Sequence, residues 1–474
     1  MINSKYFYIP LILFGLFCYP IISADVLYRD DVARSVFSFS AWGGIGRPLS
    51  DYLMHIFSLN FNLLPNTAPL PLLSGILIVA ITIWFVSIKL SKDNNPLAFC
   101  IMLTSIYVSP LFLQNIAFQF DAITMIIANS LCIISFFIYD NRISKNSLLS
   151  LIALIACLSF YQPCANIFIA LTAWNILYNN AKIKSIHAIF LFVLSYAIYY
   201  FLMFYVLKIS ADNRSDIVAI QDLPAHLISV YSRILNYINS LGLLFKIIIL
   251  VGFLSYVIIY FKGMYKERKN KIIYFLIYIL SPIALLISMP GPSIILKEGI
   301  TDVRVLSGAS AVIAILLYST YRLTNNKVYL LIFTLITFIT ISLSFQFSNA
   351  IKEQRKYEEF VLTMVSYDLT KINYNGSVYT YGAIYDSPIT WKILEASPFI
   401  GHIYSPAVPW ISISMMHQFS IVNVANITDV TNSNKLKDVC DNTRYSQLIH
   451  NRYYSIFKNT DSDIIISFGA NPCL

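Results

Sequence analysis

The chain has 474 residues, of which 57% are hydrophobic and 12% are charged, and its mean hydropathy is +0.67. A soluble domain carries roughly 25% charged residues, so this composition excludes an ordinary water-soluble protein and indicates a chain solvated largely by lipid. The net charge of +9 does not indicate a nucleic-acid partner, because the basic residues lie in short loops between apolar runs, a pattern that orients membrane proteins.

Eleven apolar stretches approach the length of roughly 17–25 residues that spans a bilayer. They cover residues 7–23, 70–90, 96–113, 122–139, 147–163, 165–178, 187–207, 241–261, 272–289, 304–320 and 329–345. The first stretch follows Lys5 as in a signal peptide, but Ile22 occupies the position where cleavage requires a small residue. We therefore expect an uncleaved membrane anchor.

The stretches 147–163 and 165–178 are separated by Tyr161-Gln162-Pro163 and form either two spans in a tight hairpin or one broken helix. A broken helix at membrane depth must face protein or a water-filled cavity, so Tyr161 and Gln162 are candidates to line a polar pocket; a plain helix break is the alternative. Net basic or neutral loops alternate from the N-terminus, which indicates a cytoplasmic N-terminus. Eleven spans then place the C-terminus outside, whereas ten would not.

We predict an all-α polytopic membrane protein with about eleven transmembrane helices in residues 1–345. A small α+β extracytoplasmic domain is predicted at residues 346–474, with a charged helix at 349–371 and strands at 377–384 and 463–468. Cys440 and Cys473 lie in this polar tail, where an extracytoplasmic location would permit a disulfide between them.

The first outer loop, residues 24–69, carries adjacent carboxylates at Asp30 and Asp31, with Arg34 one helical turn later. Trp42 begins an aromatic-glycine turn, and Arg47 precedes a proline suited to the first turn of a new helix. A carboxylate can accept the proton of an acceptor hydroxyl, and arginines bind phosphate. The alternative is a solvated loop with surface ion pairs, which contribute little free energy.

Two later residues extend the candidate site. Asp121 lies at the outer end of a span, where it faces either the bundle interior or the water interface. Arg304 opens a span, where it either reaches a lipid phosphate or extends to the headgroups without a specific ligand. No zinc-ligand spacing, P-loop or nucleophile elbow is present in the sequence, and the motifs leave a metal unassigned.

Several of these motifs together resemble a known family. The residues Tyr28-Arg29-Asp30-Asp31, then Arg34, Trp42 and Gly46-Arg47-Pro48-Leu49, resemble the serotype-converting O-antigen glucosyltransferases of the Gtr type. The motifs Asn115 to Asp121, Tyr161-Gln162-Pro163 and Arg304-Val305-Leu306 follow in the order of that family, so the resemblance spans roughly residues 5–345.

The resemblance implies a GT-C type membrane glycosyltransferase of the bacterial inner membrane, with a cytoplasmic N-terminus and a periplasmic C-terminus. Its donor would be a sugar, usually glucose, on undecaprenyl phosphate, and its acceptor would be lipopolysaccharide O-antigen. A lipid-sugar flippase and a polyprenyl-phosphate glucosyltransferase would be functional partners, and no prosthetic group would be required.

By the same resemblance, Asp30 or Asp31 would be the general base. Arg34, Arg47 and Arg304 would bind the donor phosphate, while Asp121, with Trp42, Tyr161 and Gln162, would line the acceptor pocket. Two other functions are compatible with a polytopic chain of this kind: a flippase or transporter of a lipid-linked sugar, and an O-antigen polymerase or ligase.

Overall fold

The computed structural model describes residues 4–90, 95–140, 142, 144–179, 182–209, 216–267, 272–297, 302–372, 374, 376–421, 423–426, 445–459 and 462–469. The chain divides into two compact units. Unit 1 comprises residues 1–21, 40–63 and 67–345, and unit 2 comprises residues 22–39, 64–66 and 346–474. The predicted Cys440–Cys473 disulfide lies outside the described residues.

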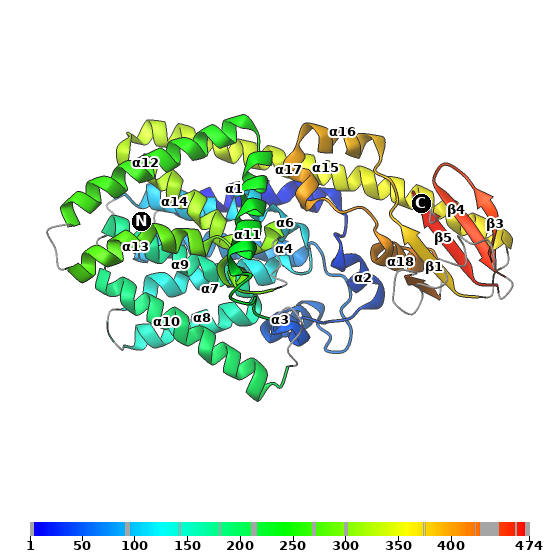
Figure 1. The fold of residues 1–474 in the computed structure, drawn as a ribbon, viewed down its shortest axis with the longest axis horizontal. Helices are drawn as coiled ribbons and strands as arrows, with labels where there is room; N and C mark the ends of the chain where they lie inside the picture. Colours follow the sequence, from blue (N-terminus) through cyan, green and yellow to red (C-terminus); the bar gives the residue numbers. More distant parts are fainter. Residues whose placement is uncertain are drawn as a thin grey trace. The chain divides into compact units, whose positions relative to one another are not determined.

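Unit 1 is helical, and Figure 1 shows several of its long helices, among them α7, α8, α9, α10 and α13, running side by side. Each predicted apolar stretch contains a helix. These are α1 (Lys5–Ala24), α4 (Leu70–Phe85), α5 (Pro96–Tyr107), α7 (Ala122–Ile138), α8 (Lys145–Phe160), α9 (Asn166–Asn179), α10 (Lys182–Phe201), α12 (Leu243–Glu267), α13 (Ile272–Ser288), α14 (Ser307–Leu323) and α15 (Asn326–Ile372).

Among the described residues, five helices are long and apolar enough to cross a membrane. They are Lys5–Ala24, Leu70–Ile88, Lys184–Val206, Leu243–Glu267 and Asn326–Ile372, with a sixth if the bent pair Pro96–Tyr107 and Pro110–Ala117 is one span. Shorter apolar helices occur at Ala122–Ile138, Lys145–Phe160 and Ile272–Ser288. The mostly helical, membrane-compatible fold is therefore confirmed, whereas the number of eleven spans stays a prediction.

The predicted stretch 96–113 is not one straight helix. The chain leaves α5 at Val108 and continues through a 3-10 turn (η3, Pro110–Phe112) into the short α6 (Leu113–Ala117), with a bend of 46°. Pro110 cannot donate the backbone hydrogen bond that would continue α5, and the Ser109 hydroxyl instead accepts from the amide of Leu111, which starts the new turn.

Two further boundaries refine the predicted helices. The 147–178 region contains two separate helices, because the chain is extended at Tyr161 and then forms a 3-10 turn (η4, Gln162–Ala165) between α8 and α9. The prediction that Arg304 is the first residue of a helix is wrong. Arg304 lies in a 3-10 turn (η8, Val303–Val305), and α14 begins only at Ser307.

Three short helices lie in the outer loop and in the loop before α12. They are α2 (Asp30–Phe37), α3 (Pro48–Ser58) and α11 (Leu223–Ser240). Pro48 occupies the first position of α3, as predicted from its fixed backbone angle and missing amide hydrogen. α3 packs against α8, and its Ser50 hydroxyl donates to the carbonyl of Phe160 at 2.9 Å.

Unit 2 is an α+β domain built on the C-terminal part of α15, which confirms the predicted small sheet at this end of the chain. Its described strands are β1 (Val378–Gly382), β2 (Val424–Asn426), β3 (Tyr445–His450), β4 (Tyr454–Asn459) and β5 (Ile464–Phe468), in the order β2-β1-β5-β4-β3. β1 is parallel to both neighbours, while β4 is antiparallel to β3 and β5. The helices α16 (Pro388–Ala396), α17 (Pro398–Ile403) and α18 (Pro409–Gln418) connect β1 to β2.

The division into units does not follow the predicted boundary at residue 345 alone, because residues 22–39 of the outer loop fold with the tail. Val32 of α2 lies in the same apolar core as Val361 and Val365 of α15 and Met415 of α18. Tyr28 donates a hydrogen bond to the carbonyl of Ile403. A buried apolar residue and a buried hydroxyl therefore fix the start of the loop to the tail.

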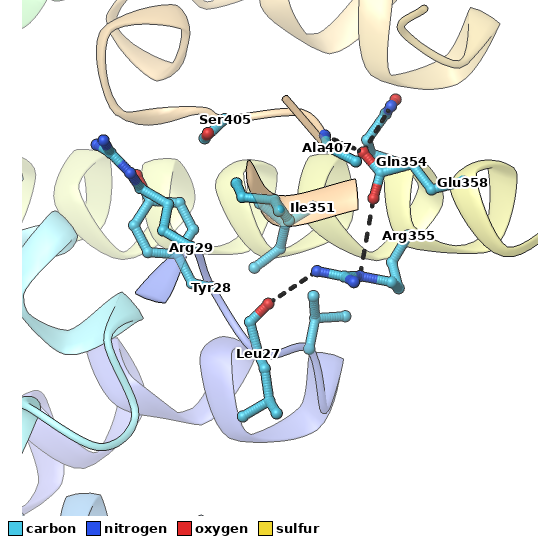
Figure 2. Close-up of a pocket in the computed structure, with 11 residues that line it drawn as sticks. Leu27, Tyr28, Arg29, Ile351, Gln354, Arg355, Glu358, Ser405 and Ala407 are labelled. Atoms are coloured by element: carbon cyan, nitrogen blue, oxygen red, sulfur yellow. Dashed lines mark hydrogen bonds and ion pairs between the residues drawn. The ribbon is translucent and has the colours of Figure 1, made fainter. Parts of the chain in front are cut away.

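A polar network on α15 also holds this segment (Figure 2). The guanidinium of Arg355 donates to the carbonyl of Leu27 at 3.0 Å and lies 3.8 Å from Glu358. Glu358 accepts from the amide of Ala407 at 2.7 Å and from the side chain of Gln354 at 3.0 Å. The side chain of Glu358, which is 3% exposed, thus contacts Ala407 directly and Leu27 through Arg355. It links three segments that are far apart in the sequence.

The buried Glu358 should make the stability of unit 2 depend on pH. Burial raises the pKa of Glu358, and the nearby Arg355 opposes that rise only in part. The folded-state pKa of Glu358 therefore exceeds the unfolded-state pKa of about 4.3, so protonated Glu358 favours the folded state. Its contribution to the free energy of unfolding is complete below the unfolded-state pKa and is lost as the pH rises through the folded-state pKa. The unfolding temperature of the native chain relative to Glu358→Gln should therefore fall as the pH rises above the unfolded-state pKa of about 4.3.

Thermal unfolding of the full chain in detergent, followed at several pH values, measures this difference. The matched control is Glu395→Gln on α16, because Glu395 is 58% exposed and pairs only at the surface with Lys392. Native and Glu395→Gln curves should run parallel with pH. Parallel curves for Glu358→Gln would contradict the expected titration.

Candidate active site

The predicted carboxylates occupy the first turn of α2, where the positive end of the helix dipole favours acidic side chains. Asp31 is 0% exposed and lies 3.7 Å from Arg34, which is 7% exposed. The predicted contact between Arg34 and the acidic pair is therefore present at Asp31. Asp30 is only partly buried. The two neighbours thus differ in environment: one is enclosed beside a cation and the other has access to solvent.

The aromatic-glycine turn in unit 1 is fixed by two carboxylates. The indole nitrogen of Trp42 donates to Asp121 at 2.5 Å, and both side chains are almost completely buried. Asp51 of α3 accepts from the backbone amides of Trp42 and Gly43. Asp121 therefore faces the interior of the helical unit, one of the two positions that the sequence allowed, and it orients the predicted acceptor-side tryptophan.

Arg47 follows this turn and is positioned by the break between α8 and α9. Its Nε donates to Gln162 at 3.0 Å, and its guanidinium lies 4.4 Å from the centre of the Tyr161 ring, within the range of a cation–π interaction. Gln162 donates in turn to the Tyr199 hydroxyl at 2.7 Å. Tyr199 donates to the carbonyl of Gly46 at 2.7 Å, so the same polar group of residues holds the backbone just before Arg47 and the Arg47 side chain.

Gly46 is required at this turn because its φ is +79°, a conformation that glycine adopts without strain. A side chain there would also collide with the Tyr199 hydroxyl and approach Gln162. The glycine therefore lets the backbone pass closely beside the polar groups that place Arg47.

Arg304 is held through its backbone by the broken helix. The amide of Arg304 donates to the side chain of Gln114 at 2.8 Å, and its carbonyl accepts from Asn115 at 2.9 Å. Its guanidinium lies 4.9 Å from the ring centre of Phe118 and 3.7 Å from Asp302. The predicted cation is thus directed by three residues of the segment 114–118.

Charge couples these residues of unit 1. Burial lowers the pKa of Arg47, Tyr161 and Asp121 oppose this effect, and the like charge of Arg304 adds to it. Arginine nevertheless stays protonated in proteins. Two guanidinium groups close enough to influence each other, beside a tyrosine and a carboxylate, form a region that an incoming anion would stabilise.

The predicted site residues do not all belong to one compact unit. Six predicted residues belong to unit 1: Trp42, Arg47, Asp121, Tyr161, Gln162 and Arg304. Asp30, Asp31 and Arg34 belong to unit 2. Among the described residues, no group of three or more His, Cys, Asp or Glu side chains is arranged to hold a metal ion.

Sequence reasoning assigned no role to Tyr199, Asp51, Gln114 or Asn115. Tyr199 lies in an apolar helix among many other aromatic residues, so no local signal distinguishes it. Asp51 could have been found as an acid in the first turn of the helix that Pro48 starts. Gln114 and Asn115 follow a proline inside an apolar stretch, which marks a break where side chains must satisfy backbone groups.

Comparison with known proteins shows what this chain is similar to. An uncharacterized 55.3 kDa protein in the gtrB 5′ region of Salmonella phage P22 is 31% identical over 154 residues, covering 32% of this chain and 31% of that protein. The match thus spans about a third of the relative's length. No solved structure matches the chain. Residues 19–315, more than half of the chain, match the family described as Glucosyl transferase GtrII. The chain therefore belongs to the Glucosyl transferase GtrII family.

Proposed function

We propose that the protein is a membrane glycosyltransferase that moves a sugar, usually glucose, from undecaprenyl phosphate to lipopolysaccharide O-antigen at the periplasmic face of the bacterial inner membrane. The observation that carries this proposal is that Arg47 lies over the Tyr161 ring while the Tyr161 hydroxyl donates to the carbonyl of Arg304 at 3.5 Å, in an apolar helical unit of a glucosyl transferase family. A lipid-borne donor presents its phosphate at the membrane surface, where the two arginines would bind it without a nucleotide site.

In this proposal each arginine has a fixed task. Arg47 is stacked on Tyr161, and Arg304 is held at its backbone, so the two cations are preorganised and little conformational entropy is lost on binding phosphate. As the bond from the anomeric carbon to the phosphate breaks, negative charge grows on the phosphate oxygens. Prepositioned guanidinium groups stabilise that charge more strongly in a site shielded from water.

We propose Asp30, rather than Asp31, as the base that takes the proton of the acceptor hydroxyl. Asp31 is fully buried beside Arg34, so it is suited to fix α2, whereas Asp30 is partly open to solvent. Asp121 accepts from Trp42 and is suited to place the acceptor-side ring.

The proposal also assigns topology and partners. The N-terminus lies in the cytoplasm and the tail in the periplasm. A separate flippase brings the lipid-linked sugar across the membrane, after a polyprenyl-phosphate glucosyltransferase has made it. Genes for both partners next to the gene for this chain would support this assignment.

Transfer by the purified protein distinguishes a transferase from a transporter. The full chain in detergent, mixed with labelled undecaprenyl-phosphate glucose and O-antigen lipopolysaccharide, should yield label bound covalently to the polysaccharide. A flippase gives no covalent product, because it only moves its lipid between leaflets. Absence of transfer by chain that remains folded, together with movement of the labelled lipid in vesicles, would reject the proposed reaction.

Substitution of the acidic pair should separate chemistry from folding. Asp30→Asn should lower transfer per folded molecule by about 10²- to 10⁴-fold, the usual contribution of a general base. Asp31→Asn should instead destabilise unit 2 by about 3 kcal/mol, because Arg34 loses its buried anionic partner. Transfer rates normalised to folded protein and unfolding temperatures measure the two effects.

The reverse pattern, with a stable but inactive Asp31→Asn and an active Asp30→Asn, would move the base to Asp31. Full activity in both single variants and in the double variant would remove the base from this pair altogether.

Conservative substitution of the arginines should weaken donor binding. Arg47→Lys keeps the positive charge but loses the planar group that stacks on Tyr161 and binds phosphate through two hydrogen bonds. The KM for undecaprenyl-phosphate glucose should rise about tenfold, which corresponds to about 1.4 kcal/mol. Arg304→Lys should act in the same direction.

The matched control is Arg322→Lys, because Arg322 is an exposed arginine in the last turn of α14. Its KM should be unchanged. An unaltered donor KM in both Arg47→Lys and Arg304→Lys would contradict the assigned phosphate site.

A further inference from the structure

Helix α11 has three different faces along its length. Val230 and Ile234 are 2% exposed and pack against the protein. Beside this buried stripe, Ile228 and Leu235 are 69% and 57% exposed, although both are large and apolar. Their spacing of seven residues places them on one side of the helix.

The remaining side of α11 is polar. At 100° per residue, the positions turned away from the apolar stripe form one continuous exposed edge. The edge consists of Ser229, Arg233 and Asn236, and the exposed Ser232 and Asn239 lie between this edge and the apolar stripe. A helix with a buried stripe, an exposed apolar stripe and an exposed polar edge meets protein, an apolar medium and water at the same time.

The end of α11 lies next to a candidate membrane span. Two residues, Leu241 and Gly242, connect it to α12, which is long and apolar enough to cross a bilayer. The first residue of α12, Leu243, is 72% exposed, so lipid-accessible surface begins there. Figure 1 shows α11 running across the direction of α9, α10 and α13 instead of along them. The C-terminal end of α11 therefore lies beside the first residue of α12, and α11 extends from there across the neighbouring helices.

We propose that α11 is a membrane-surface helix, with Ile228 and Leu235 inserted at the boundary between lipid headgroups and acyl chains. Its partner is the bilayer itself. An amphipathic helix of this length lies in the interface when one face is apolar and the other is polar or cationic, and Arg233 on the polar edge can contact lipid phosphates. This inference requires that unit 1 is embedded in a bilayer and does not depend on the proposed transfer reaction.

The same helix is fastened to the chain that leads to Arg304. The His226 ring contacts the carbonyl of Ser293 at 3.1 Å, and the Tyr231 hydroxyl donates to the carbonyl of Leu286 at 3.0 Å. Just before α11, Ile217 pairs with Leu296 in an antiparallel bridge. The membrane-surface helix thus braces residues 286–297 against the lipid boundary.

Farther along α11, the link reaches the residues beside Arg304. Burial raises the pKa of Tyr237, and nearby Asp302 adds to that rise while Arg233 opposes it. Asp302 pairs with Arg304 at 3.7 Å.

Spin labels at paired positions test the inference. Single cysteines at Ile228 and Leu235, and matched ones at Ser229 and Asn236, are introduced into full-length protein whose native cysteines are replaced. Each labelled protein is reconstituted in phosphatidylethanolamine–phosphatidylglycerol vesicles. Collision with oxygen, which concentrates in lipid, is compared with collision with a water-soluble nickel chelate. A label at Val193 of α10, which is 60% exposed on a candidate span, provides the lipid reference.

The ratio of oxygen to nickel accessibility should be at least several-fold higher at 228 and 235 than at 229 and 236, and it should approach the value at 193. High nickel accessibility at 228 and 235 would show that α11 is solvated. Inaccessibility to both reagents would show that protein covers the stripe. As a second measurement, Ile228→Trp should be quenched by lipids brominated near the headgroup, and lack of quenching would also overturn the inference.

Discussion

The backbone of Arg304 is held at its amide and at its carbonyl by the side chains of Gln114 and Asn115. In a unit surrounded by lipid, backbone groups outside regular helices must find partners within the protein, since water is not available at depth. The bend after α5 and the turn before α14 are therefore linked, because the bend supplies the side chains that hold the backbone of the turn. The break at Tyr161 joins the same arrangement through Arg47. The bend after α5, the turn before α14 and the break between α8 and α9 together account for the placement of both arginines.

The fold class could be predicted because its signals are local and numerous. The apolar runs and the charged continuation after residue 345 each indicated a helix that the structure contains. The strands at 378–382 and 464–468 were visible as β-branched and aromatic runs in a polar tail. The strand order was not predictable. β1 pairs with β5, which is far from it in the sequence, and no local pattern in the chain between them indicates this pairing.

The residues of the candidate site could be selected from the sequence, but their division between the two compact units could not be predicted. Asp31 and Arg34 could be paired from helical spacing alone. The contact between Arg355 and the carbonyl of Leu27 could not, because a backbone carbonyl carries no sequence signature and the two residues are 328 positions apart. The hydrogen bond between Trp42 and Asp121 could not be predicted either. Each residue could be selected as a candidate from its local sequence, but nothing in the sequence indicated that the two are partners. Long-range polar contacts to the backbone thus decided which predicted residues share a unit.

The compact unit that contains the tail is discontinuous in sequence, and this affects how such proteins can be recombined. A tail exchanged between two relatives at residue 345 would leave behind Val32, which fills its core, and the carbonyl of Leu27, which satisfies Arg355. Such a chimera would lose a buried apolar contact and one hydrogen bond of Arg355 unless residues 22–39 of the host supplied the same groups. The exchangeable module consists of residues 22–39, 64–66 and 346–474 together, so inheritance of the tail as a working part requires two segments of the outer loop as well as the tail itself.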